Sequence, residues 1–161
     1  MDAPRITLVD VQEVAPAARR VIAQFERDFA GLLDQTEVHH IGATALPFGH
    51  TKGDVDVNVR VAGPQFLVTV AALGKRLTAA QQENWSETFA SFSTDAYALP
   101  LGIQVTSIGS KDDFLLSLRD RMRADPSLLR RYDDAKITAA ARGAEAYWQA
   151  KHDLLQEILV D

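Results

Sequence analysis

The stretch Asp54-Val55-Asp56-Val57-Asn58-Val59-Arg60-Val61 decides the fold, because it alternates polar and apolar residues without a break. Successive side chains of a β-strand point to opposite faces, so the four valines share one face and the four polar residues share the other. Gly63-Pro64 ends the pattern. The sequence therefore predicts a strand over residues 54–61 with one apolar and one polar face.

Asp54 and Asp56 are the strongest candidates for chemistry on this strand. Their Cα atoms are expected about 7 Å apart on one face, from the rise of a strand. Two parallel carboxylates repel each other and raise each other's pKa, and a divalent cation relieves that repulsion. Oxygen ligands of this kind suit Mg²⁺ or Mn²⁺. The alternative interpretation is an edge strand whose polar face is solvated.

A second candidate element lies upstream, where an expected strand over residues 37–41 runs into Gly42-Ala43-Thr44. Glycine allows close backbone approach, and successive N–H groups in such a turn can bind an anion. The alternative is an ordinary turn between a strand and a helix, with Thr44 as the helix cap. His39 and His40 precede the turn on adjacent strand positions, so at most one of them faces the site.

The rest of the chain predicts strands and helices that build one domain over residues 1–161. Pro126 and Gly143 divide a helical C-terminal region, residues 111–160, into three helices. The expected fold class is α+β, with a mixed β-sheet packed by helices. The further expected elements are a helix from Pro16 to Leu33, a helix over 65–77, strands over 85–92 and 101–108, and a turn at Ser93-Thr94-Asp95.

Composition narrows the classes of function. The 161 residues are 47% hydrophobic and 24% charged, with a net charge of -5 and no cysteine, which excludes disulfides and thiolate metal sites. No apolar run approaches the roughly 20 residues that span a bilayer. The first five residues do not resemble a signal peptide, and we expect a cytoplasmic protein. Extended nucleic acid is a poor partner for an acidic chain, but one nucleotide needs only a few local cations and a metal.

Three basic residues are candidates for phosphate binding. Lys52 lies in the loop just before the aspartate pair. Arg119 and Arg123 are four residues apart on one face of an expected helix, and guanidinium groups suit bidentate phosphate contacts. The alternative for the arginines is surface pairing with the aspartates near them in the sequence.

These residues resemble the GrpB-like family, a branch of the nucleotidyltransferase superfamily. The segment from His40 to Pro47 is similar to the family's HIGSTAVPG pattern, and Lys52-Gly53-Asp54-Val55-Asp56-Val57 is similar to the KPxxDxxV pattern that follows it. Weaker similarities continue to the C-terminus. They include Leu118 to Arg123, Asp125-Pro126, Tyr132, Lys136, Tyr147 and Lys151.

The resemblance implies a nucleotidyltransferase-like fold in which the turn holds a triphosphate and the aspartates hold metal. Gly42 and Ala43 then fall on the turn, and Asp54 and Asp56 on the metal pair. Three positions depart from the pattern. Ala43 replaces a serine, Gly53 replaces a proline, and Gln104 stands where the family tends to have histidine and active superfamily members a third carboxylate.

Three hypotheses of function follow. The first is an enzyme that transfers a nucleotidyl group from a nucleoside triphosphate to an unknown acceptor, with Mg²⁺ or Mn²⁺ on Asp54 and Asp56. The second is a nucleotide-binding or regulatory module on the same fold that has lost catalysis, which Ala43 and Gln104 favour. The third is a protein-interaction domain that uses the helical C-terminal region.

Overall fold

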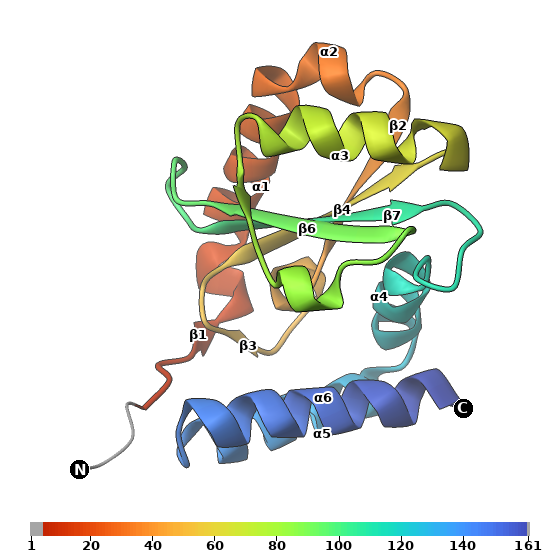
Figure 1. The fold of residues 1–161 in the computed structure, drawn as a ribbon. Helices are drawn as coiled ribbons and strands as arrows, with labels where there is room; N and C mark the ends of the chain where they lie inside the picture. The colour runs from red at the N-terminus through yellow and green to blue at the C-terminus, as the bar shows by residue number, and fades with distance from the viewer. Residues whose placement is uncertain (1–4, 161) are drawn as a thin grey trace.

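A computed structural model of the protein describes residues 5–160 and contains a five-stranded mixed sheet with helices on both faces (Figure 1). The sheet has the order β2-β4-β7-β6-β5, in which β4 and β7 run parallel and all other neighbours run antiparallel. The strands are β2 (Thr36–Ile41), β4 (Val55–Val61), β7 (Leu101–Ser107), β6 (Phe89–Thr94) and β5 (Thr78–Ala79). β1 (Val9–Asp10) and β3 (His50–Thr51) form a separate antiparallel pair.

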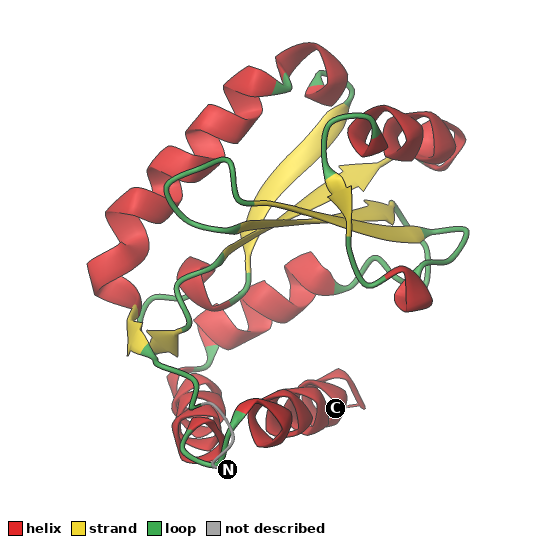
Figure 2. Ribbon diagram, turned by 60° about the vertical axis from the view of Figure 1, so that its left-hand side comes forward, coloured by secondary structure: helices red, strands yellow, loops and turns green. Residues whose placement is uncertain are grey.

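The helices form two groups, one on each side of the sheet (Figure 2). One group consists of α1 (Val11–Asp28), α2 (Ala30–Leu33) and α3 (Phe66–Gly74). The other is the C-terminal region, with α4 (Leu115–Ala124), α5 (Pro126–Ala140) and α6 (Ala144–Val160). Short 3-10 helices are η1 (Ala43–Ala45), η2 (Gly63–Gln65) and η3 (Gln82–Asn84). The structure thus confirms the α+β class, the mixed sheet and the three C-terminal helices. The expected domain spans residues 1–161, of which residues 1–4 and 161 lie outside the described residues.

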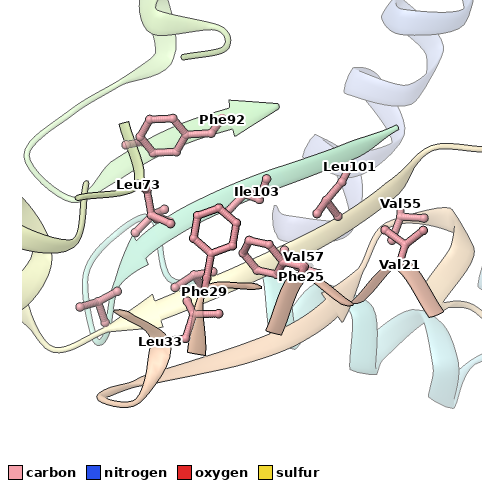
Figure 3. Packing of buried hydrophobic residues seen from close by; sticks show 14 of the residues in the cluster. Val21, Phe25, Phe29, Leu33, Val55, Val57, Leu73, Phe92, Leu101 and Ile103 are labelled. Atoms are coloured by element: carbon pink, nitrogen blue, oxygen red, sulfur yellow. The ribbon is translucent and has the colours of Figure 1, made fainter. Parts of the chain in front are cut away.

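The valine face of β4 forms the centre of the hydrophobic core. All four valines of the strand are 0% exposed. Phe25 from α1 and Leu73 from α3 belong to the same cluster, which Figure 3 shows from close by. Burial of an apolar side chain of this size contributes about 1.5–3 kcal/mol. A shift of one residue in register would expose the whole valine set, so the core directs the aspartates of β4 to the opposite face.

β4 is a central strand of the sheet, which excludes the alternative of a solvated edge strand. β4 lies between β2 and β7, and its Asn58 is 0% exposed. The Asn58 amide nitrogen donates to the Gln104 carbonyl oxygen and to the Thr106 hydroxyl, each at 3.0 Å. Further along the strand, Arg60 forms a bidentate pair with Asp113, with both bonds 2.7 Å long.

Several predicted boundaries are wrong. β6 begins at Phe89 rather than at residue 85, α3 ends at Gly74 rather than at residue 77, and the first predicted helix divides at Phe29 into α1 and α2. The first helix begins at Val11, not at Pro16, because the Asp10 side chain accepts a hydrogen bond from the backbone N–H of Gln12 at 2.7 Å and caps the helix there. Pro16 lies inside this helix and removes one backbone bond without ending it. Ser93 and Thr94 belong to β6 rather than to a turn, because pairing with β7 extends the strand.

Candidate functional site

Asp56 is enclosed between two glycines on neighbouring segments. It pairs with Ile41 of β2 and Gly102 of β7. A Cβ atom at position 42 would lie 2.7 Å from Oδ2 of Asp56, and one at position 102 would lie 2.6 Å from Oδ1. A real Cβ atom essentially never lies within 3.0 Å of another heavy atom to which it is not bonded, so the carboxylate occupies space that any other residue at these two positions would fill.

The Gly42 turn lies directly beside Asp56, so the two candidate elements meet in space. Gly42 has φ +76°, a conformation that glycine adopts readily, and η1 follows it. The first bonds of this turn are donated by the backbone N–H groups of Ala45 and Leu46. Within residues 5–160, the N–H groups of Ala43 and Thr44 donate to no protein acceptor at hydrogen-bonding distance.

The hydroxyl of Thr44 is already engaged by a histidine. Its Oγ1 lies 2.7 Å from Nε2 of His40, and Thr44 is buried. Burial, together with the charges of Arg123 and Arg119, lowers the pKa of His40 to about 4. His40 is therefore neutral at pH 7 and lies on the sheet face opposite to Asp56, while His39 pairs with Glu37 at 2.9 Å.

Asp54, Asp56 and Gln104 line one polar hollow of about 300 Å³. The shared hollow confirms that the two aspartates face the same side of the strand. Nζ of Lys52 lies 3.5 Å from Oδ2 of Asp54 and 4.2 Å from the centroid of the Trp148 ring. Trp148 comes from α6, is 47% exposed and lines the same hollow, so the C-terminal region supplies an aromatic wall.

Burial and neighbouring charges change the titration of this site. Burial, with a smaller contribution from the Asp54 charge, raises the pKa of Asp56 to about 6 against the opposing charges of Lys151 and Lys52. Burial lowers the pKa of Lys151, which the two aspartates partly offset. Lys151 lines the polar hollow and makes no hydrogen bond or ion pair with any other described residue. The site thus contains a carboxylate and an ammonium group that are both enclosed by protein.

The two predicted arginines lie in different places. Arg119 lines a second, smaller cavity together with Gly42 and Asp56, and its Nη1 donates to the His40 carbonyl at 3.0 Å. Arg123 donates twice to the Ala45 carbonyl, at 2.9 and 2.7 Å, and lines a hollow on the α1 side with His40 and Thr44. Both arginines therefore hold α4 against the Gly42 turn, and Arg119 alone of the two also lines a cavity with Asp56.

The donor set suits a hard divalent cation. Asp54 and Asp56 offer carboxylate oxygens and Gln104 offers an amide oxygen in the same hollow. Mg²⁺ commonly takes one or two carboxylates and completes its shell with water and phosphate oxygens. No cluster of three His, Cys, Asp or Glu side chains suited to a metal occurs in the described part of the chain, so a third carboxylate ligand is absent there.

Sequence reasoning missed two residues of α6, Trp148 and Lys151. Only the similarity to the family pattern pointed to Lys151. For Trp148 the sequence offered nothing beyond its three-residue spacing from Lys151, which places both residues on one helix face. Their approach to Asp56 depends on how α6 packs below the sheet (Figure 2), which local patterns do not specify.

No helix within residues 5–160 is long and apolar enough to cross a membrane.

Comparison with known proteins assigns the chain to a family. A UPF0157 protein of Vibrio cholerae serotype O1 is 24% identical over 147 residues, covering 91% of this chain and 78% of that protein. The crystal structure of the conserved protein GrpB from Enterococcus faecalis superposes with a TM-score of 0.67 at 15% identity, covering 95% of this chain and 99% of the other, and so shares its fold. The model of the GrpB protein family matches residues 9–161, and the chain belongs to that family.

Proposed function

We propose that this protein transfers a nucleotidyl group from a nucleoside triphosphate to an acceptor, in a reaction that depends on Mg²⁺. The observation that carries the proposal is the convergence of Asp54 and Asp56 on one hollow, with the Gly42 turn against Asp56. Strand-borne carboxylates beside a glycine turn with free N–H groups suit a metal-bound polyphosphate.

Asp54, Asp56 and the Gln104 amide oxygen would hold the cation. When bound, Mg²⁺ supplies positive charge that stabilises phosphate oxygens during in-line displacement. The chain's own residues do the rest. The N–H groups of Ala43 and Thr44 donate to phosphate oxygens, and Lys52 and Lys151 offset the negative charge of the substrate. Lys52, whose side chain is 25% exposed, must leave Asp54 to do so.

Trp148 gives the hollow a surface for a nucleobase. Its indole is 47% exposed and lines the hollow with Asp54 and Ser93, whereas Gly42 lines the smaller cavity. Bases stack on aromatic side chains with little sequence preference, at about 1–3 kcal/mol per base. The hollow therefore suits a nucleotide without selecting one base strongly.

A second candidate function is nucleotide binding without turnover. Gln104 lies on β7 beside the aspartates and lines both cavities, where a carboxylate would complete a metal site. An amide is a weaker metal ligand than a carboxylate and cannot act as a general base. Ala43 also lacks the hydroxyl that serine brings to the turn in the family pattern. These two residues favour a regulatory module.

Calorimetric titration of ATP and GTP, each with and without Mg²⁺, tests the shared part of both proposals. We expect binding to wild type that needs Mg²⁺ and is lost in the Asp54→Asn/Asp56→Asn variant. A Glu87→Gln/Asp95→Asn variant removes the same charge outside the hollow and should bind as wild type does. Binding without Mg²⁺, or in the aspartate variant, would contradict the proposal. Release of pyrophosphate then separates the enzyme from the module.

A further inference from the structure

A second cavity lies beside Asp56, between the sheet and the C-terminal helices. Its volume is about 150 Å³, half that of the polar hollow, and Asp56, Gln104 and Lys151 line both. An engineered apolar cavity of about 150 Å³ in another protein admits benzene. Its apolar walls come from Ile41, Leu115, Leu118, Met122, Tyr132 and Leu155.

The charged groups at this cavity favour an anion. Two cations, Arg119 and Lys151, line it against one carboxylate, Asp56. The Arg119 guanidinium is held by the His40 carbonyl and by Asp120. Lys151 has no hydrogen-bond or ion-pair partner among residues 5–160, which leaves its ammonium group able to pair with a ligand. Lys151 is half-buried, its Nζ lies 5.2 Å from the centroid of the Trp148 ring, and the charge of Asp56 acts on it without an ion pair, so an incoming anion would supply the hydrogen-bonded partner that its ammonium group lacks.

The groups that line the two cavities also restrict which acceptor can react. Neither lining includes a histidine or a glutamate among the described residues, and the two aspartates are assigned to the metal. Gln104 is not a base, burial raises the pKa of Tyr132, and Lys151 acts here as the cation that holds the anion. A hydroxyl acceptor must lose a proton to a base, whereas a carboxylate is already ionised at pH 7. A carboxylate therefore fits both the charge of the cavity and the shortage of bases.

We propose that this cavity binds an apolar molecule about the size of a benzene ring that carries one carboxylate, and that this molecule is the nucleotidyl acceptor. The acceptor role rests on the proposed function; the binding site does not. In the transfer, a carboxylate oxygen forms a bond to the α-phosphorus, the bond from that phosphorus to the bridging oxygen breaks, and pyrophosphate leaves with the electron pair. No proton is released and nothing is oxidised or reduced.

Three probes of matched size test the site by calorimetry without nucleotide. Phenylacetate is anionic, 2-phenylethanol neutral and 2-phenylethylamine cationic. We expect phenylacetate to bind about tenfold more tightly than the alcohol, and the amine to bind most weakly. An amine that binds as tightly as phenylacetate, or no phenylacetate binding up to about 10 mM, overturns the proposal.

Two pairs of variants assign the binding to this cavity. Lys151→Met should weaken phenylacetate about tenfold and leave the alcohol unchanged, while Lys151→Arg keeps phenylacetate binding and Lys75→Met, at an exposed lysine, has no effect. Leu155→Phe should fill the cavity and abolish binding of both probes. Leu159→Phe, at an exposed position of the same helix outside the lining, should not. Unchanged binding in Leu155→Phe overturns the site.

Two measurements on wild type complete the test. Phenylacetate should shift the NMR signal of the Met122 methyl group, a measurement that does not depend on whether any variant folds. A signal that stays unshifted at saturation overturns the site. Phenylacetate should also keep its affinity when ATP and Mg²⁺ are saturating, because an acceptor binds together with the nucleotide. Mutual exclusion overturns the acceptor role and leaves the carboxylate site standing, so the two failures remain distinguishable.

Discussion

Gly42 and Asp56 are in such close contact that a single methyl group at position 42 would lie 2.7 Å from the carboxylate oxygen Oδ2. The Gly42 turn and β4 thus pack directly against each other at this point. Gly42 also has φ +76°, so both its backbone conformation and the space beside it require glycine. The relationship fixes where the aspartate points and makes the glycine part of the site.

We predict that Gly42→Ala lowers the free energy of unfolding by about 2–4 kcal/mol, because steric contact adds to backbone strain. Two controls separate these causes. Gly53 also has a positive φ, +101°, but an added Cβ there would meet no atom within 4 Å. Gly53→Ala should therefore cost about 1 kcal/mol, from backbone strain alone. Gly102→Ala meets Asp56 at 2.6 Å without positive φ and should cost about 1–3 kcal/mol. Urea unfolding measures all three; equal losses at positions 42 and 53 would contradict the contact.

We predict that Asp56→Asn stabilises the metal-free protein at pH 7.5. The pKa of Asp56 rises from its ordinary 3.8 to about 6 on folding, mainly through burial. The folded state then holds the proton more tightly, so wild type loses stability from this group as pH rises from 3.8 to 6, by up to about 3 kcal/mol. The gain from asparagine should be present above pH 6 and vanish below pH 4. Asp54→Asn, at a surface ion pair, should change stability by less than about 1 kcal/mol.

His40 should make the protein sensitive to acid. Its pKa falls from 6.5 to about 4 on folding, chiefly through burial, so the unfolded chain takes up a proton before the folded one. The stability from neutral His40 is complete above pH 6.5 and is lost as pH falls toward 4. Because solvent screens the partly exposed ring, the loss is on the order of 2 kcal/mol rather than the roughly 3 kcal/mol that the full shift would give. His40→Gln should flatten this part of the stability profile. His39→Gln, on the other face, should leave it as in wild type, and a similar flattening by both variants would refute the assignment.

The Arg60–Asp113 pair should be structural rather than part of the site. The Asp113 side chain is 7% exposed, and removal of Arg60 leaves its charge without its main partner. Arg60→Met is expected to lower the free energy of unfolding by about 3 kcal/mol. Arg131→Met breaks a pair with Glu157 in which both side chains are more than half exposed, and should cost less than about 1 kcal/mol. Thermal unfolding compares the two, and equal losses would show that burial of Asp113 does not matter.

The part of the site carried by β4 could be predicted from the sequence because it depends on local alternation. The spacing of Asp54 and Asp56 places both on one face of any strand, and the structure confirms that face. The Gly42 turn lies next to Asp56 because β2 and β4 are adjacent antiparallel strands. Both inferences needed only short stretches of chain.

The part of the site carried by α6 could not be predicted in this way. Lys151 is ninety-five positions from Asp56, and their approach depends on how α5 and α6 pack below the sheet. A helix face rich in Lys and Trp is compatible with solvent, a partner or a cavity, so its pattern does not decide among them. Element boundaries were also hard to predict, because the Asp10 cap outweighs the presence of Pro16 at the start of α1 and pairing with β7 extends β6 to Thr94.

The most direct test of the central claim is electron paramagnetic resonance of Mn²⁺ in the presence of ATP. Mn²⁺ accepts the same oxygen donors as Mg²⁺, and its free signal is lost on binding. We expect that wild type with ATP binds one Mn²⁺ beyond the amount that ATP alone binds, and that Asp54→Asn and Asp56→Asn each weaken this binding about tenfold or more, while Asp95→Asn does not. Equal Mn²⁺ binding by wild type and both site variants would contradict it.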